Sequence, residues 1–154
     1  MAISVFPAPV VSTSDTWTLI DSRTPTSGTS VSFTSISGYK TLMLAAKNIT
    51  TSSVSYLIVR LNNDSTAGDY IEQSGSGEDN FLVGTNDPER AAMIIIYDAN
   101  QAVPHKIEKS SYQSSTNNNP VFYTDAVAIT RVDLISRESH AFTGGTVYLY
   151  GITA

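Results

Sequence analysis

The sequence predicts an all-β protein, an antiparallel jelly-roll-like β-sandwich of about eight strands with an extended N-terminal arm. Short runs rich in β-branched and aromatic residues follow one another at even spacing, separated by Gly, Asn and Pro. No segment has a convincing helical period of 3.6 residues. Ser and Thr make up about a quarter of the chain and charged residues only 15%, which suits exposed strands better than exposed helices.

The strands are expected at short, regular intervals along the chain. In order, they are Trp17–Ile20, Ser30–Ile36, Thr41–Ala46, Ser55–Leu61, Phe81–Val83, Ala91–Tyr97, His105–Tyr112, one long strand or two within Val121–Ile135, and a last strand after Gly144-Gly145 that ends near Ile152. We interpret Asp21 to Gly28 as a turn-rich stretch. Ser65 to Arg90 is expected to be a long functional loop, because glycines interrupt it repeatedly.

Ala91–Tyr97 differs from the other strands because it is apolar at both odd and even positions. This pattern predicts a strand that is buried on both of its faces. A short helix at Asp87–Met93 is the competing interpretation of the same region.

The 154 residues are expected to form one domain, residues 15–154, preceded by an arm at residues 1–14. Two prolines exclude a helix from the arm. Its apolar side chains favour contact with protein, either its own sandwich or a neighbouring subunit, and we prefer the neighbour. The residues expected to make this contact are Val5, Phe6, Pro7, Pro9, Val10 and Val11.

Charge and cysteine content exclude several classes of function. The net charge of −5 and the pI of about 4.8 argue against partners such as nucleic acid or an anionic membrane. The chain has no cysteine, which excludes disulfides, zinc-thiolate sites and a cysteine nucleophile. The N-terminus lacks the basic and apolar pattern of a signal peptide, and no apolar run has the length of a membrane span. We therefore expect a soluble protein.

No catalytic site is predicted. His105 and His140 are the two histidines, and no serine lies in a Gly-x-Ser-x-Gly turn that would mark a nucleophile. A glycosidase needs two carboxyl groups with separated pKa values in one cleft. The pairs Asp69 with Glu72 and Glu78 with Asp79 lie in the glycine-rich loop, where we interpret them as solvated acids.

Two binding alternatives remain open. Asn62, Asp64 and Asp69 are the metal candidates, because they cluster near a turn and offer the oxygen ligands that Ca²⁺ prefers. Their spacing does not match an EF-hand loop, and turn-forming residues explain them without a metal, so no metal and no cofactor is predicted. Aromatic side chains offer a second alternative, a platform for sugar rings. These are Tyr70, Tyr97, Tyr112, Phe122 and Tyr123.

Three segments resemble small β-sandwich domains in virion proteins of tailed bacteriophages. The first, Val31 to Leu44, resembles a serine-rich strand, a turn, a Tyr and an apolar strand. The second, Arg60-Leu61-Asn62-Asn63-Asp64 followed by Tyr70, is similar to an Arg-Phe-Asn-x-Asp motif with a downstream Tyr, with Leu61 in place of Phe. The third, Gly144 to Ile152, resembles the terminal strand. The middle of the chain, Ser65 to Pro120, matches only loosely.

This resemblance implies a non-enzymatic, self-associating virion component with a jelly-roll-like fold. Because the chain has no predicted shaft or coiled coil, we expect a capsid decoration or cement protein on the outer surface of the virion, assembled in the host cytoplasm. Its expected partners are the major capsid protein and further copies of itself, as a homotrimer. The alternative is a tail-tip or tail-fibre protein that recognises host-surface glycan through its long loops.

Overall fold

The computed structural model describes residues 16–71, 77–85, 91–111 and 121–153, and these ranges contain twelve strands and no helix. No helix able to cross a membrane therefore occurs in them. The strands are β1 (Thr18–Arg23), β2 (Ser30–Phe33), β3 (Tyr39–Thr51), β4 (Tyr56–Leu61), β5 (Tyr70–Ile71), β6 (Gly77–Glu78), β7 (Phe81–Thr85), β8 (Ala91–Tyr97), β9 (His105–Ser111), β10 (Val121–Tyr123), β11 (Val132–Ser136) and β12 (Phe142–Thr153).

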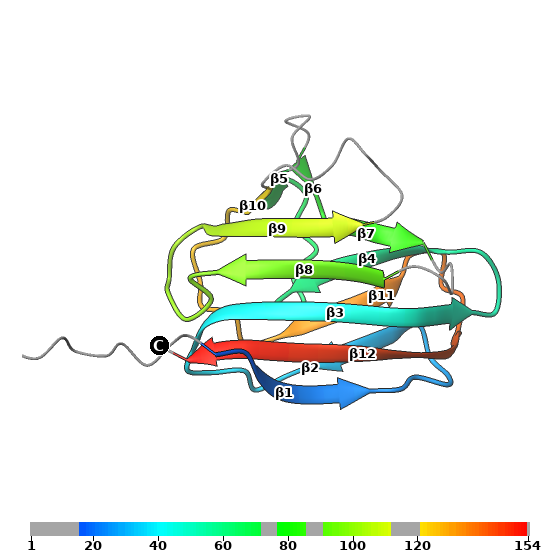
Figure 1. Cartoon of the computed structure of the whole chain (residues 1–154). Coiled ribbons are helices and arrows are strands. Elements are labelled where there is room, and N and C mark those ends of the chain that lie inside the picture. Colours follow the sequence, from blue (N-terminus) through cyan, green and yellow to red (C-terminus); the bar gives the residue numbers. More distant parts are fainter. Residues whose placement is uncertain (1–15, 72–76, 86–90, 112–120, 154) are drawn as a thin grey trace, which may run out of the picture.

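Two antiparallel sheets face each other, with the larger sheet in front in Figure 1. The larger sheet has the order β1-β12-β3-β8-β9-β10-β5-β6, and the smaller has the order β2-β11-β4-β7. In each sheet, strands from the first part of the chain alternate with strands from its second part. This is a jelly-roll-like order, with β1-β12-β3-β8 opposite β2-β11-β4-β7. The all-β sandwich is confirmed. Eight of the strands form this framework, and β9, β10, β5 and β6 extend the larger sheet.

Several predicted boundaries were wrong. β1 continues through Arg23, where a turn was expected, because a bulge at Ile20 shifts its register against β12 and hides the alternation. The region from Ser65 to Arg90 holds β5, β6 and β7 rather than a single short strand. Pairing with β10 creates β5, and pairing with β5 creates β6, so neither strand has a local sequence signal.

Two open questions of the sequence are answered. Residues 91–97 form the strand β8 and not the end of a helix, because they pair along their whole length with β3. Residues 86–90, the start of the alternative helix, lie outside the described residues. The stretch from Val121 to Ile135 contains two strands, β10 and β11, which belong to different sheets.

The terminal strand β12 depends on Gly145 and Gly151, which lie in close contact with β3. β12 begins at Phe142, so Gly144 and Gly145 lie within the strand and not in a turn before it. Gly145 has a φ of 96°, and a Cβ there would lie 2.5 Å from the carbonyl oxygen of Asn48. A Cβ on Gly151 would lie 2.3 Å from the ring of Tyr39. Glycine at these two positions lets β3 and β12 pair closely.

The core lies between the sheets and is apolar. Leu42, Leu44, Ile94 and Ile96 of the larger sheet are at most 2% exposed and face the smaller sheet. Phe33, Val59 and Leu134 are among the side chains that the smaller sheet contributes to the same cluster. Burial at this level supplies the main favourable free energy of folding.

Candidate functional site

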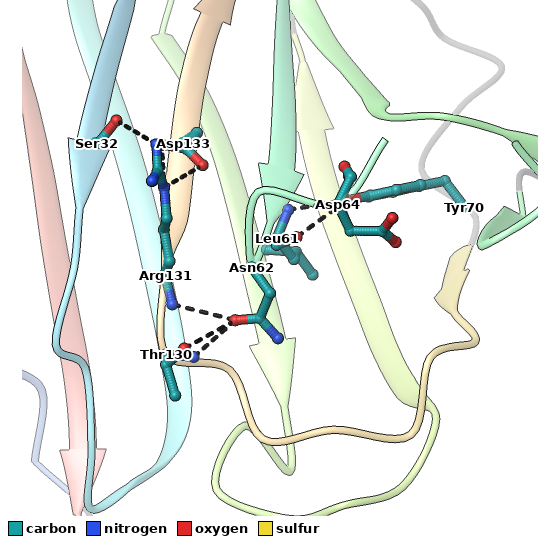
Figure 2. Close-up of polar contacts among 8 residues, drawn as sticks. All are labelled: Ser32, Leu61, Asn62, Asp64, Tyr70, Thr130, Arg131 and Asp133. Atoms are coloured by element: carbon teal, nitrogen blue, oxygen red, sulfur yellow. Dashed lines mark hydrogen bonds and ion pairs between the residues drawn. The ribbon is translucent and has the colours of Figure 1, made fainter. Parts of the chain in front are cut away.

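The turn after β4 contains the Arg-Leu-Asn-Asn-Asp motif of the sequence. Asn62 and Asn63 have φ values of 53° and 58°, in the left-handed region that Asn tolerates better than most residues. The Asn62 Oδ1 accepts hydrogen bonds from the backbone N–H of Thr130 (2.8 Å) and of Arg131 (3.2 Å), and its Nδ2 donates to the carbonyl of Ala128 (3.1 Å). Figure 2 shows how this side chain joins the turn to the segment before β11.

Tyr70, the downstream tyrosine of the motif, is fully buried and closes the same turn. Its hydroxyl accepts a hydrogen bond from the Leu61 N–H (3.0 Å) and donates to the carbonyl of Asp64 (3.0 Å), as Figure 2 shows. Burial raises the pKa of this hydroxyl well above its usual value, so it stays protonated. The ring contacts Phe81 edge-on at 4.8 Å between centroids. Tyr70 is therefore a structural part of the core.

Asp64 is committed to the turn as well. Its Oδ1 accepts the N–H of Thr66 (2.8 Å), and its Oδ2 accepts the hydroxyl of Tyr123 (3.1 Å). Desolvation by burial acts to raise the pKa of Asp64, but these hydrogen bonds outweigh it and hold the pKa below the usual value. The carboxylate is ionised at neutral pH and stabilises the turn.

The structure places two of the three metal candidates, Asp64 and Asp69, together and the third, Asn62, apart. The Asn62 oxygen points to the segment before β11, whereas Asp64 and Asp69 lie on the side of Tyr123 and Thr124. Within the described ranges no group of three His, Asp or Glu side chains is arranged to hold a metal ion. The oxygen ligands of this region are used as hydrogen-bond acceptors within the protein.

The smaller sheet holds an ion pair with a buried carboxylate that no sequence pattern predicted. Asp133 of β11 is 2% exposed, and both of its oxygens accept hydrogen bonds from the Arg131 Nε, at 2.9 and 2.8 Å. The Arg131 Nη2 also donates to the Ser32 hydroxyl of β2 at 3.2 Å. Asp133 lies in an apolar run without a motif, and its burial and the contact of Arg131 with Ser32 follow only from the pairing of β11 with β2.

The carboxylates considered for a glycosidase are exposed or bonded to neighbouring side chains where the structure describes them. Asp79 makes an ion pair with Arg60 at 2.5 Å, while Glu78 is exposed to solvent. Asp69 accepts a hydrogen bond from the Thr124 hydroxyl at 3.3 Å. Glu72, its predicted partner, lies outside the described residues.

No nucleophile and base are paired at the buried histidine. The two ring nitrogens of His105 lie 3.2 Å from the Tyr97 carbonyl and 2.7 Å from the Val127 carbonyl, so the ring joins the end of β8 to the loop between β10 and β11. The buried Ser55 hydroxyl donates to Glu138 Oε2 at 2.7 Å. This bond lowers the pKa of Glu138, which makes that carboxylate a poor general base.

The predicted sugar platform is not formed by its five aromatic residues. Tyr70 and Tyr123 are fully buried in the core, and Tyr112 lies outside the described residues. Phe122 is 44% exposed, while the Tyr97 hydroxyl donates to Glu108 at 2.9 Å. These two residues belong instead to a larger feature, the solvent side of the eight-stranded sheet.

We call this feature the outer sheet face. The register places side chains in rows across β1, β12, β3 and β8, because directly paired residues of antiparallel strands point to the same face. One row is Leu19, Tyr150, Met43 and Ile95; the next is Tyr148, Ala45 and Met93; and the third is Ile152, Thr41 and Tyr97. All are half-buried except Leu19, which is 50% exposed. Figure 1 shows no described strand in front of this face.

A small cleft lies at the β1 edge of the sandwich. It has a volume of about 190 Å³, with Ile20, Phe33, Ile36, Tyr39 and Leu149 as its apolar lining. The polar lining residues are Asp21, Thr34, Ser35 and Ser37. The cleft is smaller than a typical ligand pocket.

Searches for relatives return nothing that assigns a family: no protein-family model matches the chain, and no curated protein matches it. The residues predicted to contact a subunit or capsid, Val5 to Val11, lie outside the described residues. The outer sheet face is therefore the feature that the described structure offers for a functional assignment.

Proposed function

We propose that this chain is a non-enzymatic virion structural protein that decorates the outer shell of a phage capsid as a homotrimer. The observation that carries the proposal is the outer sheet face, where Met, Ile and Tyr side chains occupy positions that a solvated antiparallel sheet fills with polar residues. A contiguous apolar surface of this kind marks an interaction site.

Other observations support a binding role over catalysis. In the described residues, the polar groups of the motif turn are used to hold β4, β11 and the β5 region together. Every buried side-chain nitrogen and oxygen there has a partner, so no orphan polar group is held ready for a substrate. A rigid sandwich with an apolar face is well suited to assembly on a protein shell.

Copy number in purified particles tests this function. Quantitative mass spectrometry should give close to one copy for each major capsid protein, together with saturable binding to empty capsids. A handful of copies per particle would contradict decoration and place the protein in the tail.

The cleft at the β1 edge favours a second candidate, a tail-tip protein that binds host glycan. Its apolar floor and its rim of Asp21 and hydroxyl side chains match the mixed character of a sugar ring. A glycan array should then give hits that Asp21→Ala removes. An array without hits, together with capsid binding, would reject this candidate.

A further inference from the structure

In β8, the hydrophobic pattern of the sequence and the burial of the side chains in the structure disagree. The sequence predicts that β8 is buried on both faces, yet the structure covers only one of them. Ile94 and Ile96 are 1% and 0% exposed, while Met93 and Ile95 on the other face are half-buried and have no described segment above them. The second covering layer must therefore come from outside the described sandwich.

The size of the face limits how two copies can meet. Four strands, β1 to β8 in sheet order, and the seven residues over which β3 pairs with β8 give about 20 Å by 24 Å, or roughly 500 Å² in projection. A stable interface buries about 800 Å² on each partner. Two faces in direct contact would fall short of that area, so a second patch on each copy is needed.

The charge around the face permits self-association. Its β9 border carries an ion pair that neutralises itself, Lys106 with Glu108 at 2.9 Å, whereas Asp21 and Arg23 of β1 pair with Leu149 and Val147 and so belong to the inner side of the sheet. The rows of the face contain no ionisable group other than tyrosine, and Lys47 at the end of β3 adds one positive charge. A chain with a net charge of −5 repels its copies elsewhere, and this face avoids that repulsion.

The N-terminal arm has the chemistry to cover this face. Residues 1–14 contain no charged side chain, and Pro7 and Pro9 have no N–H that would be buried without a partner. The ten residues 2–11 reach about 33 Å when fully extended, which is longer than either dimension of the face. The arm joins β1, the edge strand of the face, beside the end of β12, because Thr18 pairs with Gly151. The chain therefore enters β1 at one end of the face.

We propose that residues 2–11 of one copy lie across the outer sheet face of a second copy, and that repetition of this contact closes the assembly into a ring. Each copy then contributes two patches, its face and its arm, which compensates for the small area of the face. The contact is heterologous, so it closes only as a ring. The trimeric size of the ring rests on the proposed function, whereas the contact itself is tested on the purified protein without capsids.

The absence of cysteine allows a direct test by cross-linking. A tagged full-length chain carrying Val10→Cys is co-expressed with an untagged chain carrying Ile95→Cys, and the purified assembly is treated with a short bismaleimide. The matched control replaces Ile95→Cys with Val54→Cys, at an exposed position outside the face. We expect at least about tenfold more product joining the two chains with Ile95→Cys, because a bound arm has a high effective concentration at the face.

Sedimentation equilibrium of full-length variants supplies a second readout. Phe6→Asp in the arm and Ile95→Asp on the face should each convert the oligomer to a monomer with an unchanged circular dichroism spectrum, whereas Val54→Asp should leave it assembled. Dissociation by Ile95→Asp alone would show that two faces pack directly. Cross-links within a single doubly substituted chain would show that the arm covers its own face. Both results overturn the proposal.

The failure of this inference can be separated from failure of the proposed function. Suppose that the wild-type protein is a monomer and that Ile95→Asp abolishes its binding to empty capsids. This result would overturn arm exchange and leave decoration intact. An arm-exchanged oligomer without affinity for capsids would support the inference and reject decoration.

Discussion

Consecutive residues of β8 lie on opposite faces of the larger sheet, and the two faces differ in what covers them. Ile94 and Ile96 pack against the smaller sheet, and Met93 and Ile95 lie on the outer sheet face. The side chains are chemically alike, so hydrophobicity alone does not separate core from interface. A substitution on the inner face should change stability, and one on the outer face should change assembly.

The motif turn at the end of β4 resembles the inner face in one respect: its side chains find their partners within the chain. Asn62, Asp64 and Tyr70 are bound to backbone and side-chain partners within the chain. We therefore expect this turn to affect stability without affecting assembly. The following predictions test that division, in order of decreasing effect.

The largest effect is expected in the core. Ile94→Ala should lower the free energy of unfolding by about 3 kcal/mol, because it removes buried methyl groups and leaves a cavity. Urea unfolding measures it, at protein concentrations too low for association. The matched control, Ile95→Ala on the outer sheet face, should cost less than about 1 kcal/mol under the same conditions. Equal losses would contradict the difference between the two faces.

The motif turn should give an intermediate effect. Asn62→Ala removes the acceptor of the Thr130 and Arg131 N–H groups and should cost about 2 kcal/mol in urea unfolding. Asn63→Ala is the matched control, because Asn63 has nearly the same backbone conformation but is exposed. The oligomer should persist in both variants. Loss of assembly in Asn62→Ala while the chain remains folded would show that the turn contributes to the interface.

The smallest effect is expected from acid titration of Asp64. Its pKa in the folded protein lies below the usual 3.8, so its contribution is complete above that value and is lost as the pH falls through the folded-state pKa. Between about pH 5 and about pH 2.5, Asp64→Asn should lose less stability than the wild type. Tyr123→Phe, which removes one donor to this carboxylate, should give an intermediate slope. Parallel pH profiles for all three proteins would contradict this assignment.

Much of the framework could be predicted from local pattern. Alternating β-branched and aromatic residues placed the long strands, and Asn62-Asn63 placed the turn after β4. β5 and β6 were missed because two-residue strands exist only through their partners. The hydrogen bond from Arg131 to Ser32 was missed for a similar reason, since these residues are 99 apart in sequence.

The sequence by itself determined the all-β class, the acidic and cysteine-free character, and the apolar content of both faces of β8. Periodicity and composition are local properties, which is why one chain suffices to predict them. Only the tertiary structure decided which apolar residues are core and which form the outer sheet face. It also decided that Asn62 binds the segment before β11, whereas Asp64 binds Thr66 and Tyr123. These outcomes depend on strand register and sheet order, which bring together residues that are distant in sequence.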